Sequence, residues 1–183
     1  MKVSREQMLE NRRRILEAAA RLFREKGFDG VSVSEVMKAA GLTHGGFYGH
    51  FSSKDELVAG TMTYILDKDS GAGGNLSAFL DSYLSSEHRD NAGLGCPTAA
   101  LAAEARHQDQ LARAAIGTGL KAQIDRISRA LPQGVTSDRR RAAIGTWAAM
   151  VGSMILARAV DDPALSEELL SETKAWIKER LET

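Results

Sequence analysis

The sequence is poor in cysteine and proline and has no long hydrophobic run. Its 183 residues include one cysteine, Cys96, and three prolines. A single cysteine has no partner within the chain, which excludes a disulfide-stabilised secreted fold. The longest uncharged run, residues 142–157, is shorter than the roughly 20 apolar residues that span a bilayer. Because the N-terminus is charged and does not read as a signal peptide, we expect a cytoplasmic protein without a membrane segment.

The chain also has no excess charge of either sign, with 24 basic side chains against 24 acidic ones. Neutrality excludes a protein that coats nucleic acid regardless of sequence, because non-specific binding depends on positive charge. The charges are unevenly placed, however. Residues 1–55 hold ten basic and seven acidic side chains, whereas residues 56–183 hold fourteen and seventeen. A mildly basic N-terminal part beside a mildly acidic remainder is compatible with site-specific DNA binding.

Helix-forming residues dominate the composition. No proline precedes Pro97, and Ala, Leu, Glu, Arg and Lys are abundant. A first amphipathic helix is expected to end at Gly27, and its apolar stripe consists of Ile15, Ala18, Ala19, Leu22 and Phe23. Because similar stripes recur along the chain, we predict an all-α protein of about nine helices.

Capping and breaking residues set the other expected boundaries. Ser32 and Glu35 form a capping box, and Gly41 ends the helix that they begin. Thr43 and Ser53 are expected to cap the next two helices. The later helices are expected at residues 76–86, 98–107, 109–131, 138–160 and 163–181.

Residues 33–51 have the spacing of a helix-turn-helix, in which the second helix enters the major groove. That second helix is rich in glycine, at positions 45, 46 and 49, and each glycine costs a helix about 1 kcal/mol relative to alanine. On a helical wheel the glycines lie opposite Phe47 and Phe51, which we place in the core. A face without Cβ atoms lets the backbone approach another surface closely, and DNA is such a surface.

We therefore predict that this helix binds a double-stranded DNA operator. Its free N–H groups can hold a phosphate, and the side chains beside the glycines can reach phosphates or base edges. The candidate DNA-binding residues are Ser32, Ser34, Thr43, His44, Gly45, Gly46, Tyr48, His50 and Lys54. The run Arg12–Arg14 is less specific, since such runs are usually solvated helix faces.

The stretch AGLTHGGFYGHF at residues 40–51, followed by KDEL at 54–57, closely resembles the DNA-binding domain of TetR-type transcriptional regulators. ILEAA at 15–19 and the segment 22–28 are similar to the first helix of that domain. The resemblance implies a helix-turn-helix domain at 1–55 and a ligand-binding and dimerisation domain at 56–183. It also implies a homodimer that a small-molecule effector releases from a palindromic operator.

One departure from that family lies in the glycine-rich helix. Many relatives carry Thr or Ala near position 46 and a larger polar residue at 49, where this chain has glycines. Fewer side chains are then available for direct base readout. We expect more reliance on Ser34, on a basic arm at Lys2 and Arg5, and on DNA shape.

The resemblance places a ligand pocket among the middle helices and a four-helix dimer interface near the C-terminus. The pocket candidates are Met62, Leu66, Phe79, Tyr83, Cys96, Leu101, Leu120 and Trp147. Because apolar and aromatic residues dominate them, they indicate a small hydrophobic or aromatic effector, although a packed core has the same composition. The interface candidates are Trp147, Met150, Met154, Leu169, Thr173 and Trp176, and internal core is the alternative for these too.

Three further features leave alternatives open. Cys96 before Pro97 would cap a helix and could act as a redox or electrophile sensor, or it could simply pack. Glu104 and His107 have the Glu-x-x-His spacing of di-iron bundles, but there is no second such pair, so we expect no metal site and no cofactor. A helical-bundle enzyme is disfavoured, because the chain has no phosphate-binding glycine loop and no nucleophile–base pair.

Overall fold

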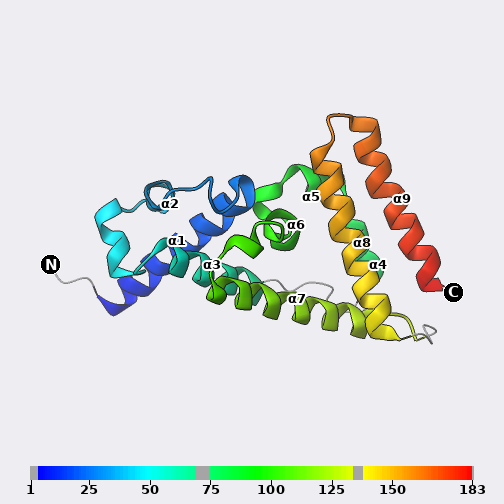
Figure 1. Cartoon of the computed structure of the whole chain (residues 1–183), viewed down its shortest axis with the longest axis horizontal. Helices are drawn as coiled ribbons and strands as arrows, with labels where there is room; N and C mark the ends of the chain where they lie inside the picture. Colours follow the sequence, from blue (N-terminus) through cyan, green and yellow to red (C-terminus); the bar gives the residue numbers. More distant parts are fainter. Residues whose placement is uncertain (1–3, 69–74, 134–137, 183) are drawn as a thin grey trace.

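A computed structural model describes residues 4–68, 75–133 and 138–182, which form helices and no strand (Figure 1). The α-helices are α1 (Arg5–Lys26), α2 (Val33–Ala39), α3 (Lys54–Lys68), α4 (Leu76–Tyr83), α5 (Ser86–Asp90), α6 (Pro97–Leu101), α7 (Gln110–Ala130), α8 (Arg139–Ala159) and α9 (Pro163–Glu182). The 3₁₀ helices are η1 (His44–Gly49), η2 (Ala92–Leu94) and η3 (Ala105–His107). The all-α prediction is confirmed.

Three predicted helices differ from those observed. The expected helix 76–86 ends at Tyr83, because the Ser85 hydroxyl accepts a hydrogen bond from the His88 N–H and begins α5. The expected helix 98–107 divides into α6 and η3, where the backbone tightens to an i→i+3 bond from Glu104 N to Leu101 O. The glycine-rich third helix is 3₁₀ throughout.

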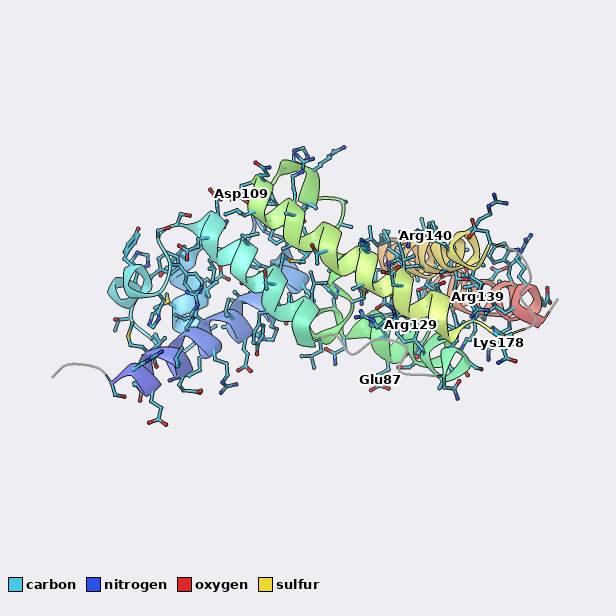
Figure 2. All side chains as sticks on the ribbon, turned by 90° about the horizontal axis from the view of Figure 1, so that it is seen from below. Glu87, Asp109, Arg129, Arg139, Arg140 and Lys178 are labelled. Carbon is cyan, nitrogen blue, oxygen red and sulfur yellow. The ribbon has the colours of Figure 1, made fainter. Side chains whose placement is uncertain are left out.

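The molecule is elongated, with the N-terminal helices at one end and the α8–α9 pair at the other (Figure 1). α7 connects the two ends: it packs against α3 on one side and α8 on the other. At the start of α8, the guanidinium of Arg139, labelled in Figure 2, donates to the carbonyl oxygens of Ser128 and Leu131 at 2.8 and 2.7 Å. These bonds satisfy carbonyl groups that the end of α7 leaves without helical partners.

Two hydrophobic cores hold the fold together. The first joins α1, α2, η1 and α3, and it includes Leu101 from the end of α6. The second joins α4, α7, α8 and α9 around Leu80, Trp147 and Met150. Since Leu57 and Val58 belong to the first core, that core extends beyond the predicted division at residue 55. We call residues 4–53 the head and the part from α4 onward the body.

α8 is long and apolar enough to span a bilayer by length and composition alone. In the structure it is a core helix, since Trp147, Met150 and Met154 are buried among α4, α7 and α9. A buried helix in a packed protein passes the same compositional test, so α8 is not evidence for a membrane segment.

Candidate DNA-binding and effector-binding sites

The first helix of the helix-turn-helix is fixed by the predicted capping box. Ser32 Oγ accepts from the Glu35 N–H at 3.2 Å, and the Ser32 N–H is 3.4 Å from Glu35 Oε2. The same carboxylate lies 2.6 Å from Lys26 Nζ, and this ammonium lowers the pKa of Glu35. Gly41 then turns the chain with φ +67°, a conformation that favours glycine.

η1 is anchored to the head core by its aromatic residues. Phe47 and Phe51 are 1% exposed, and their rings stack with centroids 5.7 Å apart. Most of the predicted DNA-binding residues lie on the exposed side: Ser32, Ser34, Thr43, His44, Gly45, Gly46 and Tyr48. His50 and Lys54 are half-buried. Thr43 makes no capping hydrogen bond, which differs from the prediction and leaves its hydroxyl at the exposed start of η1.

The glycines of η1 are not required by packing. A Cβ atom on Gly45 would meet nothing within 4 Å, and one on Gly49 would meet only the Met8 methyl at 4.0 Å. A Cβ on Gly46 would make ordinary contacts, 3.7 Å from the Met37 methyl. The packing of the head therefore leaves room for side chains on this face and does not itself require glycine.

Two arginines of the Arg12–Arg14 run act inside the head. The Arg12 guanidinium lies 4.0 Å from the Phe51 ring centroid and donates to the carbonyl oxygen of His50. Burial, aided by this positive charge, lowers the pKa of His50. Arg13 pairs with two carboxylates of its own helix. The Arg12 contacts hold the end of η1 against α1, which the solvated-face interpretation of the run did not anticipate, whereas the exposed Arg13 agrees with that interpretation. Lys2, part of the predicted basic arm, lies outside the described residues, while Arg5 is exposed at the start of α1.

A cavity of about 830 Å³ lies between the head and the body. One wall is formed by α1, through Glu17, Ala20, Arg21 and Arg24. The facing wall is aromatic: the Phe79 and Trp147 rings stack at 6.4 Å, and the Tyr83 ring meets Trp147 edge-on at 5.3 Å. Cavities of this size are typical of sites for drug-sized ligands.

Four of the eight predicted pocket residues line this cavity, namely Phe79, Tyr83, Cys96 and Trp147. Met62, Leu66 and Leu101 instead line a much smaller gap between α3 and α6. Leu120 is exposed on α7 and reaches neither space. Sequence reasoning missed the polar wall of α1, because Arg21 and Arg24 carry no local signal that distinguishes them from solvated helix residues.

His88 connects the cavity wall to the start of α6. The Cys96 N–H donates to His88 Nε2 at 2.9 Å, so this nitrogen is unprotonated, and Nδ1 donates to the Tyr83 carbonyl oxygen at 2.7 Å. The Arg158 guanidinium donates to the His88 carbonyl oxygen at 2.7 Å. Burial lowers the pKa of His88; the Tyr83 hydrogen bond opposes this effect and Arg158 adds to it. The imidazole is therefore neutral, and Cys96 is a buried thiol beside it.

The lowered pKa of His88 predicts a loss of stability in mild acid. The unfolded chain takes up this proton near pH 6.5, above the folded pKa, so the stabilising contribution is complete above that pH. It is lost as the pH falls through the folded pKa. We expect the Tm to fall between pH 7.5 and 5.5, and to fall less in His88→Gln. His50→Gln should flatten the profile less, since His50 is the less buried group. Parallel Tm profiles for wild type and His88→Gln would contradict the assignment.

The predicted interface residues fall into two sets. Trp147, Met150 and Met154 are buried in the protomer's own core, because they point from α8 toward α4 and α7. On α9, Leu169 and Thr173 are half-buried, and Trp176 is 46% exposed beneath the Arg180 guanidinium. Exposed apolar side chains of both helices form what we call the outer face: Ile144, Ile155, Leu156, Leu165 and Trp176. Ala148 is exposed on α8, and no atom lies within 4 Å of a Cβ built on Gly145 or Gly152.

The Glu-x-x-His pair forms no metal centre in the described part of the chain, where no group of three or more candidate ligands occurs. His107 Nε2 accepts a hydrogen bond from the neighbouring Arg106. Glu104 instead accepts a hydrogen bond from the Phe28 backbone N–H at 2.8 Å.

Both the N-terminal and the C-terminal part of the chain match families of known proteins. Residues 15–61 match the family described as "Bacterial regulatory proteins, tetR family", and residues 73–172 match "Tetracyclin repressor-like, C-terminal domain". The HTH-type transcriptional regulator AcrR of Shigella flexneri is 41% identical over 56 residues, which cover 31% of this chain and 26% of that protein. An uncharacterized HTH-type regulator of Bacillus subtilis, YuxN, is 38% identical over 61 residues, or 33% of this chain. The matched region is 21% of YuxN's length, so the chain spans only a small part of the curated relatives it matches.

Likeness in structure extends over nearly the whole chain. A TetR transcriptional regulator from Chloroflexus aurantiacus superposes with a TM-score of 0.76 and 25% identity, covering 94% of this chain and 96% of that one. The agreement in structure therefore covers far more of the chain than the sequence likenesses to AcrR and YuxN do.

Proposed function

The chain belongs to the TetR family of bacterial transcriptional regulators, and from that premise we propose how its parts divide the work. Ligand-responsive repression of transcription is the general function of this family. The η1 face binds a palindromic operator, the outer face of α8 and α9 joins two copies, and the cavity between head and body holds the effector. The observation that carries this proposal is the composition of the cavity walls: one wall is α1 of the head, with Tyr64 and Ile65 of α3 beside it, and the other is the body.

The DNA-binding face consists of the exposed residues around η1. Thr43 and the free N–H groups at the start of η1 are positioned to hold a phosphate. Tyr48, 71% exposed with its ring against Phe47, can reach the backbone or a base edge. His44 and Ser34 are exposed on the same side of the head core. The smooth glycine face between them allows the close approach that these contacts need.

The effector is a neutral aromatic compound. Three aromatic side chains form one wall, and stacking on them favours a flat apolar molecule. The charged residues lining the cavity balance, with Arg21 and Arg24 against Glu17 and Glu87, and His88 is neutral. Arg21 and Glu17 already have ion-pair partners, Glu25 and Arg13 respectively. A ligand with a net charge would be costly to bury here, because the lining offers no excess of opposite charge to compensate it. The lining therefore favours a ligand without a net charge.

We expect 1-N-phenylnaphthylamine, a neutral aromatic dye, to bind the cavity and weaken operator binding by at least tenfold. A ligand that occupies the space between head and body changes their relative position, and DNA affinity changes with it. The measurement uses dye fluorescence for binding, and fluorescence anisotropy with a DNA duplex that the protein selects from a random library. Dye that binds without moving operator affinity would contradict the assigned role of the cavity.

Two tryptophan substitutions on α4 provide the matched control. Ser82 lines the cavity, so Ser82→Trp fills part of it and should abolish dye binding while leaving operator affinity within threefold. Ser77 is exposed on α4 and is not among the residues that line the cavity. Ser77→Trp should therefore behave as wild type. Equal dye binding by both variants would place the dye elsewhere.

Other activities fit this assignment less well. The family consists of transcriptional regulators, which disfavours the helical-bundle enzyme, and the thiol-sensor alternative is likewise not favoured. We assign Cys96 a packing role in the cavity wall, where its buried thiol lies between His88 and Pro97. The cytoplasm is the compartment where such a regulator meets its operator.

A further inference from the structure

Glu104 makes a direct contact between the body and the head. Its carboxylate accepts a hydrogen bond from the Phe28 N–H at 2.8 Å, across 76 residues of sequence. Phe28 follows the end of α1, and its fully buried ring meets Phe23 edge-on at 5.4 Å. The carboxylate therefore holds the backbone at the point where the first helix of the head ends.

Gly27 allows this contact to form. Its φ of +78° ends α1, and its N–H donates to the Phe23 carbonyl oxygen at 2.8 Å. A Cβ atom built on Gly27 would lie 2.4 and 2.8 Å from the two carboxylate oxygens of Glu104. A side chain at this position would displace the carboxylate, so glycine lets the carboxylate rest directly against the backbone.

Glu104 is also one end of a short segment that begins at the cavity. Cys96 and Pro97 line the cavity, and the Cys96 N–H is held by His88. α6 follows, and Leu101 at its end is 1% exposed within the head core. Three residues later the chain reaches Glu104. Residues 96–104 thus contact the cavity at one end and the end of α1 at the other.

We propose that Glu104 is a positioning residue that sets the orientation of the DNA-binding head, and that residues 96–104 transmit occupancy of the cavity to it. The second half of this statement rests on the proposed function of the cavity. A ligand that displaces Cys96 and Pro97 moves the start of the same short segment that carries Glu104. The hydrogen bond to Phe28 then turns the head with it.

A second contact between the head and the body allows the role of Glu104 to be tested separately from folding. Arg24 Nε donates to the Gly93 carbonyl oxygen at 2.8 Å, and α1 packs against η2 and α6. The head therefore remains attached when Glu104 is truncated. Its orientation becomes less restricted, and the two heads of a dimer meet an operator less often in the right spacing.

The test compares Glu104→Ala, Glu104→Gln and His107→Ala in the full-length protein without ligand. Operator affinity is measured on the selected duplex, and the Tm is recorded for each variant. We expect Glu104→Ala to lose five- to twentyfold in affinity. Glu104→Gln keeps an acceptor for the Phe28 N–H and should stay within twofold of wild type. His107 lies next to the same segment and its ring bonds to the neighbouring Arg106 rather than to the head, so His107→Ala should leave affinity unchanged.

This design separates positioning from charge and from stability. Loss of a negative charge by itself would raise DNA affinity in both Glu104 variants. For Glu104→Ala, that change is opposite to the loss of affinity that the positioning role predicts. A purely stabilising role would lower the Tm of Glu104→Ala and leave its operator affinity intact, and that result would overturn the proposal. Hydrogen exchange of the Phe28 amide should accelerate at least tenfold in Glu104→Ala alone.

The dye arm distinguishes this inference from the cavity assignment. In wild type, 1-N-phenylnaphthylamine should lower operator affinity at least tenfold; in Glu104→Ala it should bind equally well and lower affinity less than threefold. If the dye does not change the operator affinity of wild type while Glu104→Ala still loses affinity, the cavity assignment and the transmitting role are wrong. The positioning role of Glu104 is supported in that case. Full release by dye in Glu104→Ala would overturn the transmitting role alone.

Discussion

Replacing both Gly45 and Gly49 by alanine is expected to stabilise the protein and weaken operator binding at the same time. A Cβ on Gly45 meets no atom, and one on Gly49 meets only a flexible methionine methyl. Alanine restricts the unfolded chain more than glycine does, so each substitution should add about 0.5–1 kcal/mol of stability. For a protein of this size, the pair should raise the Tm by about 2–8 °C.

The same two methyl groups should lower operator affinity at least tenfold. They would project from the face that we assign to DNA, where a phosphate or base edge must come close to the backbone of η1. The opposite signs are the informative feature, since a substitution that damaged the head would lower both quantities. Differential scanning fluorimetry and fluorescence anisotropy on the selected duplex measure the two effects on one preparation.

Gly117 on α7 is the matched control. A Cβ atom added there would also meet no atom within 4 Å, and the residue is exposed and lies in the body. Gly117→Ala should give a similar gain in Tm without changing operator affinity. If the double alanine variant bound the operator as tightly as Gly117→Ala does, the glycine face would not be a DNA-contacting surface.

Local patterns predicted the head well because its boundaries depend on neighbouring residues. The capping box at Ser32, the turn at Gly41 and the end of α1 at Gly27 are all interactions over a few positions. The 3₁₀ form of η1 was not predicted, since the apolar spacing of Phe47 and Phe51 fits an α-helix as well. Helix class here depends on how those rings meet the core.

The cavity and the Glu104 contact depend on residues far apart in sequence. The bond from Phe28 to Glu104 spans 76 residues, and the cavity brings Arg24 together with Trp147. No periodic pattern marks either pair. The Glu-x-x-His spacing drew attention to Glu104 as a possible metal ligand. In the structure its carboxylate instead accepts a hydrogen bond from the Phe28 N–H of the head.

Introducing arginine at Ala148 is expected to convert the dimer into a monomer and to lower operator affinity by at least a hundredfold. Ala148 is exposed on α8, one helical turn from Gly145 and from Gly152, and a Cβ on either glycine would meet no atom within 4 Å. Small residues at this spacing let a second α8 approach closely, while Ile155 and Leu165 supply apolar area around them. A guanidinium at the centre of that contact would be buried without a partner.

The loss of affinity follows from the palindromic operator. In a dimer, the second head meets its half-site at a high effective concentration once the first is bound, whereas a monomer binds each half-site separately. Sedimentation at low micromolar concentration and anisotropy with the selected duplex measure the two effects, with Ala114→Arg on the exposed side of α7 as the control. Circular dichroism verifies that the monomer remains helical. A folded Ala148→Arg variant that sediments as a dimer would exclude this face as the interface, because no dimer could bury an arginine there at so little cost.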